Sequence, residues 1–365
     1  KIDDVEKRHI ITELGTALFV VSSTLILKLG IATVALVGSA LLIRGEIDIP
    51  LFFMFLLVAS RLYAPLEGAL QNLAAVISTK TNIDRMNEIL DQPIQTGENQ
   101  LINKGYDIVF DHVDFSYAGE GGNLSLKNVN LHIESGQTIG IIGGTGSGKS
   151  TLINLIPRFY DVTEGKITVD GEDIRNISQH ALRDAIGYVP QKGVLFSGTI
   201  ASNLKYGRED TTQEQMEEAI AIAQAKEIVD GKKDGYDSPI AQGGSNVSGG
   251  QKQRFSIARA IVKDPKIYIF DDSFSALDYK TDAALRKELA GKTKDATVFI
   301  VAQRISTILH AEQIIVLDEG RVAGIGTHEE LMKNCSVYRD IAASQLTQYD
   351  LEQIAESGKG DESHE

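Results

Sequence analysis

Residues 138–159 read TIGIIGGTGSGKSTLINLIPRF, and this stretch decides the fold of the larger part of the chain. An apolar strand, Thr138–Ile142, leads into a glycine-rich loop, and a helical run follows from Thr151 to Phe159. The glycines let backbone N–H groups curl around phosphate oxygens, and the start of the helix adds the positive end of its dipole. The stretch therefore predicts a strand–loop–helix cradle for a nucleoside triphosphate.

Particular residues of the cradle have chemical tasks. Lys149 is placed to reach the β- and γ-phosphates, and the Ser150 hydroxyl is placed to bind Mg²⁺. Downstream, Ile267–Asp271 is predicted to be a buried strand that ends in a carboxylate, and Asp271 would hold the same hydrated ion. The residues predicted to contact nucleotide here are Gly143, Gly144, Thr145, Gly146, Ser147, Gly148, Lys149, Ser150 and Thr151. The alternative is a plain glycine-rich turn, against which the flanking strand and helix argue.

Short β-rich runs alternate with helical runs from Asp107 onward. The strand-like runs are 108–110, 140–142, 167–169, 267–270, 298–301 and 314–317, and helical patterns at 216–225 and 283–290 lie between several of them. Such alternation predicts an α/β domain with a mostly parallel sheet. We expect this domain to span residues 107–346 and an acidic, solvated tail to occupy 347–365.

Composition limits the function classes that fit the chain. Its 365 residues carry a formal net charge of −14, with 50 acidic against 36 basic side chains. That balance argues against a nucleic-acid partner, because phosphate neutralisation needs a basic face. Cys335 is the only cysteine, which excludes an intramolecular disulfide and a cysteine-rich metal site and fits a reducing compartment.

Two apolar runs near the start have a different character. Gly15–Ile43 contains one charge, Lys28, and is long enough to span a bilayer as a tilted helix. Ile49–Ser60 is shorter, and a run of that length is by itself more typical of a buried core helix, but it continues past Arg61. The alternative is a pair of core helices in a soluble domain, and the length of the first run argues against it.

The charges around these runs predict a hairpin through a membrane. Basic residues precede the first run and follow the second, whereas the connection 44–48 carries one basic and two acidic residues. By the positive-inside tendency, both ends face the cytosol and the connection faces out. We expect helices at about 11–44 and 49–90 within a partial membrane domain, 1–93, with a kink at Pro65 and a linker at 94–106. Because the sequence begins with Lys1 rather than Met, we expect it to be an incomplete start.

A second group of motifs lies downstream of the cradle. Ser248-Gly249-Gly250-Gln251 is preceded by Val247 and followed by Lys252-Gln253-Arg254. The motifs follow one another in the order phosphate loop, Gln191, Ser248–Gln251, Asp271 and Ser275–Asp278. Together they resemble those of the ATP-binding cassette transporters, in particular half-size exporters with a membrane domain before the cassette.

This resemblance implies a fold and a set of ligands. The fold is an α/β P-loop NTPase cassette, in which a mostly parallel sheet is joined by an antiparallel β part and a helical subdomain. A partial α-helical transmembrane domain precedes it and corresponds to the last two membrane helices of a half-transporter, with the earlier ones missing. The implied ligands are ATP and Mg²⁺, and the implied surroundings are a lipid bilayer, with the cassette in the cytosol, and a second half-transporter.

The resemblance also assigns roles to residues outside the phosphate loop. Tyr117 would stack on the adenine ring, its alternative being an aromatic residue of a hydrophobic core. Gln191 would lie near Mg²⁺ and transmit nucleotide occupancy to the membrane helices, its alternative being a turn glutamine. The stretch Ser248, Gly249, Gly250 and Gln251 would bind the γ-phosphate of ATP held by a second cassette, so a lone copy cannot complete an ATP site.

The sequence departs from the family pattern at three positions. Asp272 stands where active cassettes have a glutamate, and the missing methylene retracts the carboxylate by about 1.5 Å. Gln303 replaces a histidine, and its amide neither titrates near neutral pH nor shuttles a proton. Gln242 replaces a glutamate that exporters carry upstream of the signature. Asp272 and Gln303, together with Gln191, form the predicted catalytic set.

These departures favour one half of a heterodimeric exporter in the cytoplasmic membrane, with a degenerate ATP site of its own. A homodimeric exporter with slow turnover and a regulatory ATP-binding subunit without transport activity stay open as alternatives. A soluble ATPase acting on nucleic acid conflicts with Gly15–Ile43 and with the acidic charge. The transported compound cannot be read from these residues.

Overall fold

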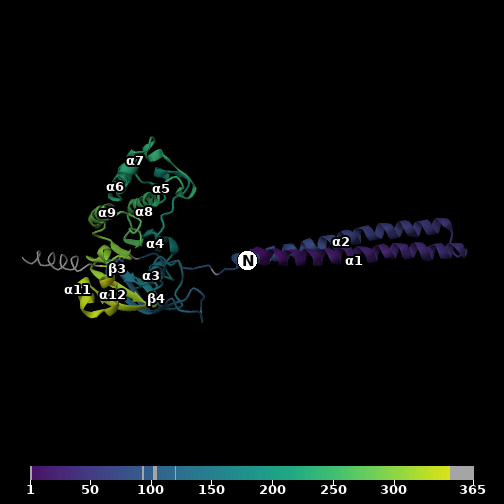
Figure 1. Cartoon of the computed structure of the whole chain (residues 1–365), viewed down its shortest axis with the longest axis horizontal. Helices are drawn as coiled ribbons and strands as arrows, with labels where there is room; N and C mark the ends of the chain where they lie inside the picture. Colours follow the sequence, from purple (N-terminus) through teal and green to yellow (C-terminus); the bar gives the residue numbers. More distant parts are fainter. Residues whose placement is uncertain (1, 93, 102–104, 120, 346–365) are drawn as a thin grey trace, which may run out of the picture. The chain divides into compact units, whose positions relative to one another are not determined.

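The computed structural model describes residues 2–92, 94–101, 105–119 and 121–345. It divides the chain into two compact units, one that ends at Ile94 and one that begins at Gln95 (Figure 1). The first unit is a pair of long helices, and the second contains all the strands of the described chain.

The first unit consists of α1 (Ile2–Ile43) and α2 (Ile49–Leu90). Within the described chain, the stretch Glu13–Ile43 is the one helical segment long and apolar enough to cross a membrane. The apolar part of α2, Ile49–Leu62, is shorter. The helix α2 continues through Pro65, which lies inside it. The large apolar side chains of both helices that the structure describes are mostly exposed in the isolated chain, which is unfavourable in water but not in lipid.

The start of α2 has a local cause. The Asp48 side chain accepts a hydrogen bond from the Leu51 backbone N–H at 3.2 Å, which satisfies one of the unpaired donors of the first turn. Pro50 occupies that first turn, where its missing N–H has no intrahelical partner to lose. The start of α2 is thus favoured by residues next to it in the sequence.

The second unit is built on a six-stranded sheet in the order β12-β11-β3-β10-β9-β6. Its strands are β3 (Thr138–Gly143), β6 (Ile186–Val189), β9 (Ile267–Asp271), β10 (Thr297–Val301), β11 (Gln313–Asp318) and β12 (Arg321–Gly326). All neighbours are parallel except β12, which pairs antiparallel with β11. The predicted mostly parallel sheet is confirmed, and so the carboxyl ends of β3, β9 and β10 meet at one edge.

Two smaller sheets complete the β structure. A four-stranded antiparallel sheet has the order β2-β1-β4-β5, and a two-stranded one pairs β7 with β8. Their strands are β1 (Ile108–Phe115), β2 (Leu126–Ile133), β4 (Glu164–Val169), β5 (Glu172–Asp173), β7 (Gly198–Thr199) and β8 (Pro239–Ile240). The first of these is the antiparallel part that the resemblance implied.

Some helices of the second unit cover the main sheet, and others form a separate group at one end (Figure 1). They are α3 (Lys149–Leu155), α4 (Gln179–Asp184), α5 (Ile200–Lys205), α6 (Gln213–Ile222), α7 (Lys226–Asp230), α8 (Gly249–Lys263), α9 (Tyr279–Lys292), α10 (Ile305–Ile308), α11 (His328–Asn334) and α12 (Ser336–Gln345). Figure 1 shows α5, α6, α7 and α8 gathered away from β4 and α12, as expected for a helical subdomain. The helix after the phosphate loop is shorter than the predicted 151–159, because Pro157 has no N–H with which to continue it.

The core explains why the central strands have continuous apolar sequences. Every residue of β9 is buried, and its side chains alternate between two hydrophobic clusters on opposite faces of the sheet. Tyr268 and Phe270 join the cluster that includes α8, whereas Ile267 and Ile269 join the cluster that includes β1 and α3. A parallel strand covered on both faces needs apolar residues at every position.

The segment predicted as a linker is partly bound to the second unit. The backbone N–H of Asn99 donates to the Asn176 carbonyl at 2.9 Å, and Asn99 forms a parallel bridge with Ile177. The buried Arg158 guanidinium donates to the Thr96 carbonyl at 2.5 Å and to the Arg175 carbonyl at 2.9 Å. Residues 95–101 therefore form a strap that is held on the second unit by backbone and side-chain hydrogen bonds.

Candidate functional site

The phosphate loop lies between β3 and α3, at the edge where the parallel strands end. Lys149 Nζ donates to the carbonyls of Gly143 at 2.9 Å and Gly144 at 2.7 Å, and burial lowers the pKa of its ammonium. Gly148 adopts φ +101°, and a Cβ there would lie 2.8 Å from Leu126 Cδ2. Added Cβ atoms on Gly144 and Gly146 would meet no heavy atom within 4 Å. A cavity of about 480 Å³ is lined by Gly146, Gly148, Lys149 and Ser150, so the loop borders a hollow that can take a phosphate.

The end of β9 faces this loop. Ser150 Oγ donates to Asp271 Oδ1 at 3.0 Å, and Tyr188 OH lies 3.4 Å from Asp271 Oδ2. Burial raises the pKa of the Asp271 carboxyl, and the charge of the neighbouring Asp272 acts in the same direction. A buried carboxylate of this kind becomes more favourable when a cation binds beside it.

These donors fit a magnesium ion that arrives with a nucleotide. Ser150 and Asp271 offer the oxygen atoms that Mg²⁺ prefers. In the described chain no group of three or more His, Cys, Asp or Glu side chains could hold a metal ion. An ion bound here would take its remaining ligands from phosphate oxygens and water. Ser147 Oγ is buried without a hydrogen-bond partner in the described chain, so the loop also has polar capacity left over.

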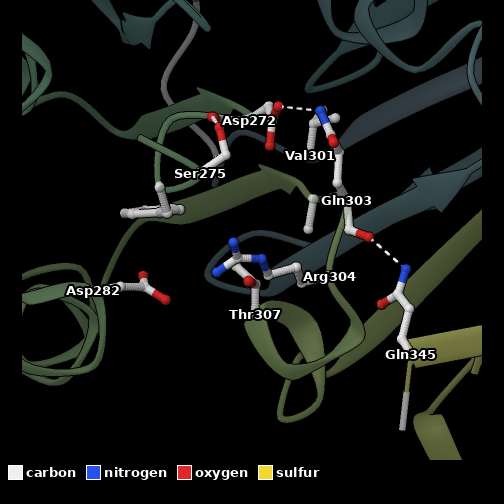
Figure 2. Close-up of a pocket in the computed structure, with 10 residues that line it drawn as sticks. Asp272, Ser275, Asp282, Val301, Gln303, Arg304, Thr307 and Gln345 are labelled. Atoms are coloured by element: carbon white, nitrogen blue, oxygen red, sulfur yellow. Dashed lines mark hydrogen bonds between the residues drawn. The ribbon is translucent and has the colours of Figure 1, made fainter. Parts of the chain in front are cut away.

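Three side chains from neighbouring strand ends meet beside the loop. Asp272 follows β9, Gln303 follows β10 and Gln191 follows β6. Asp272 Oδ2 accepts a hydrogen bond from Gln191 Nε2 at 3.0 Å and one from Gln303 Nε2 at 2.5 Å. Figure 2 shows the Asp272 and Gln303 side chains pointing toward each other. The structure thus brings together the three residues of the predicted catalytic set.

A cavity of about 400 Å³ opens next to this cluster (Figure 2). Asp272 and Gln303 line it together with Ser275, from the 275–278 stretch, and Arg304. A half-buried ion pair between Arg286 and Asp282 at 3.0 Å lies within α9, and Asp282 lines the same cavity. Arg286 also donates to the Ser306 carbonyl at 3.2 Å, which ties α9 to α10.

The signature stretch forms the start of α8. Ser248 Oγ accepts from the Gln251 N–H at 3.2 Å, and the Ser248 N–H donates to Gln251 Oε1 at 3.1 Å, which makes a capping box. Ser248 and Gly249 are exposed, and a Cβ on Gly249 would meet no heavy atom within 4 Å. The first turn therefore presents bare backbone N–H groups to solvent, which suits an anion brought by another molecule.

Tyr117 follows β1 and is 55% exposed. Its hydroxyl lies 3.1 Å from Thr151 Oγ1, in the first turn of α3. Edge-to-face contacts with Phe115 and Tyr160, at centroid distances of 4.8 and 5.1 Å, hold the ring. This exposure argues against the alternative of a core aromatic, and the bond to Thr151 places the ring close to the phosphate loop.

Sequence reasoning missed two residues that connect the site. Gln253 is buried in α8, donates to the Pro190 carbonyl at 3.0 Å and accepts from the Gly193 N–H at 2.8 Å. It therefore ties the signature helix to the loop that carries Gln191. Tyr188 donates to Asn154 Oδ1 at 2.9 Å and approaches Asp271, which ties β6 to α3. A polar residue within an apolar helix face was the available signal for Gln253.

Comparisons with known proteins identify the family of the chain. Residues 126–275 match the family model described as ABC transporter. The chain belongs to the ABC transporters. It is 40% identical over 329 residues to an uncharacterized ABC transporter ATP-binding protein of Mycobacterium tuberculosis, covering 87% of this chain and 56% of that protein. It is 36% identical to a putative multidrug export ATP-binding/permease protein of Bacillus subtilis, covering 82% of this chain and 52% of that one.

A solved structure extends the likeness to the fold. A bacterial Atm1-family ABC exporter with ATP bound superposes with a TM-score of 0.74 at 30% sequence identity, covering 91% of this chain and 58% of that one. The predicted half-size exporter type and the cassette fold after a partial helical domain are thereby confirmed. The chain spans about half the length of the curated relatives it matches.

Proposed function

We propose that this ABC transporter chain binds ATP with Mg²⁺ and serves as one half of a membrane exporter, in which its own ATP site is degenerate. The observation that carries the proposal is the side-chain pair Asp272 and Gln303, which meet at the end of β9 and β10. Hydrolysis at the γ-phosphate needs a longer carboxylate at the position of Asp272 and a titratable ring at the position of Gln303. Binding of the nucleotide needs neither the longer carboxylate nor the ring.

Binding is supported by the intact cradle. Lys149 would transfer its hydrogen bonds from the loop carbonyls to the β- and γ-phosphate oxygens. Ser150 and Asp271 would hold Mg²⁺, which when bound neutralises phosphate charge. Tyr117 would offer its ring face to adenine. None of these residue types departs from what the chemistry needs.

The residues placed for ATP hydrolysis are less suited to their task than the residues placed for ATP binding. A carboxylate that orients or deprotonates the attacking water must come within about 2.6–3.2 Å of it, and Asp272 is shorter than glutamate by about 1.5 Å. The same Asp272 oxygen already accepts two amide N–H groups. Gln303 donates to Asp272 through a neutral amide, and this amide neither takes up nor releases a proton near neutral pH. We infer that hydrolysis at this site is slow.

A second half-transporter would complete both ATP sites of the assembly. The start of α8 would receive a γ-phosphate from another cassette at the Gly249 and Gly250 N–H groups, because those of Ser248 and Gln251 already bond within the capping box. In the degenerate reading, this intact signature serves the competent site of a different chain. In the homodimeric alternative, it serves a second copy of this one.

The tagged full-length protein, purified from its native membrane with its natural partners, separates these readings. A heterodimer yields a second half-transporter whose own cassette has Glu and His at the positions of Asp272 and Gln303. A homodimer yields only this chain, and two differently tagged copies then co-purify. A regulatory subunit yields nucleotide binding by the assembly with no ATPase activity that substrates change.

The membrane part of the proposal places both ends of the α1–α2 hairpin in the cytosol of a cell whose cytoplasmic membrane it crosses. In a Cys335→Ala background, a cysteine at exposed Glu46 should react with an impermeant reagent from outside intact cells. A cysteine at exposed Thr96 should react only after the cells are opened. The opposite pattern would mean that the hairpin has the other orientation, and no outside labelling would mean that it does not span.

A further inference from the structure

The turn that carries Gln303 has backbone groups that its own residues do not satisfy. It connects β10 to the short helix α10, in which the Thr307 N–H already donates to the Arg304 carbonyl at 3.2 Å, whereas the Ile305 N–H starts the helix and has no carbonyl of α10 within reach. Arg304 stands at the N-cap position and gives α10 no side-chain cap in the described structure, since a guanidinium has donors only. The position of this turn therefore depends on a group from elsewhere in the chain.

That group is the Gln345 amide, from the end of α12. Gln345 Oε1 accepts a hydrogen bond from the Ile305 backbone N–H at 2.9 Å, and Gln345 Nε2 donates to the Gln303 carbonyl at 2.7 Å. Figure 2 shows Gln345 reaching the turn from the side opposite Asp272. One side chain thus caps α10 and grips the residue whose own amide bonds to Asp272.

The helix that carries Gln345 is itself fixed. Tyr338 and Ala342, on the same helix, are at most 1% exposed and belong to the hydrophobic cluster of the main sheet. The Tyr338 hydroxyl lies 2.8 Å from His328 Nδ1, which joins α12 to α11. Because a packed helix holds the amide, the two hydrogen bonds restrain the turn rather than follow it.

We propose that Gln345 is a positioning residue that sets where the Gln303 amide lies relative to the γ-phosphate. The proposal rests on the ATP site proposed above and adds to it a role for the C-terminal helix. The two Gln345 hydrogen bonds form a clamp on the turn that carries Gln303. In the proposed function Gln303 would face the γ-phosphate alone, whereas Lys149 would also contact the β-phosphate, which ADP retains, and Ser150 would hold the metal. Loss of the clamp should therefore weaken ATP binding and leave ADP binding almost unchanged.

The test compares ATP and ADP affinities of the full-length protein, measured by nucleotide titration. Gln345→Ala should lower the affinity for ATP by about fivefold, the effect of one ordinary hydrogen bond, and change the affinity for ADP by less than about twofold. Ser344→Ala is the matched control, because in the described part of the chain this exposed neighbour donates to the Ile341 carbonyl of its own helix and not to the turn. It should bind both nucleotides as the wild type does.

Gln345→Glu separates the two halves of the clamp. An ionised carboxylate still accepts from the Ile305 N–H but cannot donate to the Gln303 carbonyl. This variant should lose ATP affinity at least as much as Gln345→Ala. It also retains the cap of α10, so it tests the proposal even if Gln345→Ala does not fold.

A double-mutant cycle gives the sharpest outcome. In a Gln303→Ala background, Gln345→Ala should have no further effect on ATP affinity, because the group it positions is gone. An additive effect, an equal loss of ATP and ADP affinity, or wild-type ATP binding by Gln345→Glu would each overturn the role of Gln345. Failure of the wild-type protein to bind ATP would instead overturn the proposed function, so the two failures are distinguishable.

Discussion

The two sides of the nucleotide site differ in how completely they are built. On the phosphate-loop side, Lys149, Ser150 and Asp271 all have the residue types and contacts that binding requires. On the γ-phosphate side, Asp272 is one methylene shorter than the glutamate of active cassettes, and Gln303 is an amide in place of an imidazole. In the proposed function, binding and turnover are therefore separable, and they depend on two adjacent residues, Asp271 and Asp272.

The backbone explains how neighbours come to serve different sides. Asp271 is the last residue of β9 and turns its carboxylate to Ser150. Asp272 adopts φ +46°, a left-handed conformation that aspartate tolerates better than most residues, and its carboxylate turns instead to Gln191 and Gln303. The two carboxylates thus differ in direction because of the local backbone, and not only in the side chains that they replace.

The largest expected effect lies on the phosphate-loop side. Lys149→Ala should lower the affinity for ATP with Mg²⁺ by roughly 10- to 100-fold, because it removes a charged hydrogen bond of about 1.5–3 kcal/mol. Lys166→Ala is the control, since it removes the same charge from a half-exposed site on β4. Nucleotide titration of both variants makes the measurement. If Lys149→Ala and Lys166→Ala bind ATP with equal affinity, Lys149 does not contact the phosphates.

A smaller effect is expected where the base would bind. Tyr117→Ala should weaken ATP and ADP binding alike by roughly fivefold or more, the loss that removal of one stacking ring produces. Tyr117→Phe keeps the ring and removes only the 3.1 Å contact with Thr151, so its affinities should stay near wild type. If Tyr117→Phe loses as much as Tyr117→Ala, the hydroxyl rather than the ring is the important group.

The smallest effect concerns the support of the γ-phosphate side. Burial lowers the pKa of His328, although Glu329 raises it in part and His310 lowers it further. A lowered pKa in the folded protein means that the neutral ring favours the fold. That stability is present above about pH 6.5 and is lost as pH falls through the folded pKa. The melting temperature of the wild type should therefore fall on acidification from about pH 7.5 to about pH 5.5 by roughly 1–3 °C more than that of His328→Gln. Parallel falls in both proteins would show that His328 does not contribute.

Much of the fold could be predicted from local sequence. Ile267–Asp271 is apolar throughout and proved to be a strand buried on both faces. The glycine-rich loop was placed between its strand and helix because glycine spacing is a short-range signal. The end of the following helix was not predicted, because Pro157 acts against an apolar pattern that continues to Phe159.

The contacts that organise the site could not be predicted in the same way. Gln253 bonds to Pro190 and Gln345 bonds to Gln303, pairs that lie far apart in the sequence. An amide within an apolar helix face, such as Gln253, signals that a polar contact exists, but it does not identify the partner, which is a backbone group that every residue has. The strap held by Arg158 escaped prediction for the same reason, since residues 95–101 have the polar composition of a free linker.

In the proposed exporter, this chain binds ATP at its own site but supports turnover mainly at its partner's site. The most direct test is the steady-state ATPase activity of the assembled transporter carrying either Asp272→Asn or Gly249→Asp in this chain. Asp272→Asn should reduce turnover only modestly, because the carboxylate it removes is already too short to position the water. Gly249→Asp should nearly abolish turnover, because it places a carboxylate against the γ-phosphate at the start of α8. If Asp272→Asn abolishes turnover as completely as Gly249→Asp does, this site is catalytic and the degenerate reading is wrong.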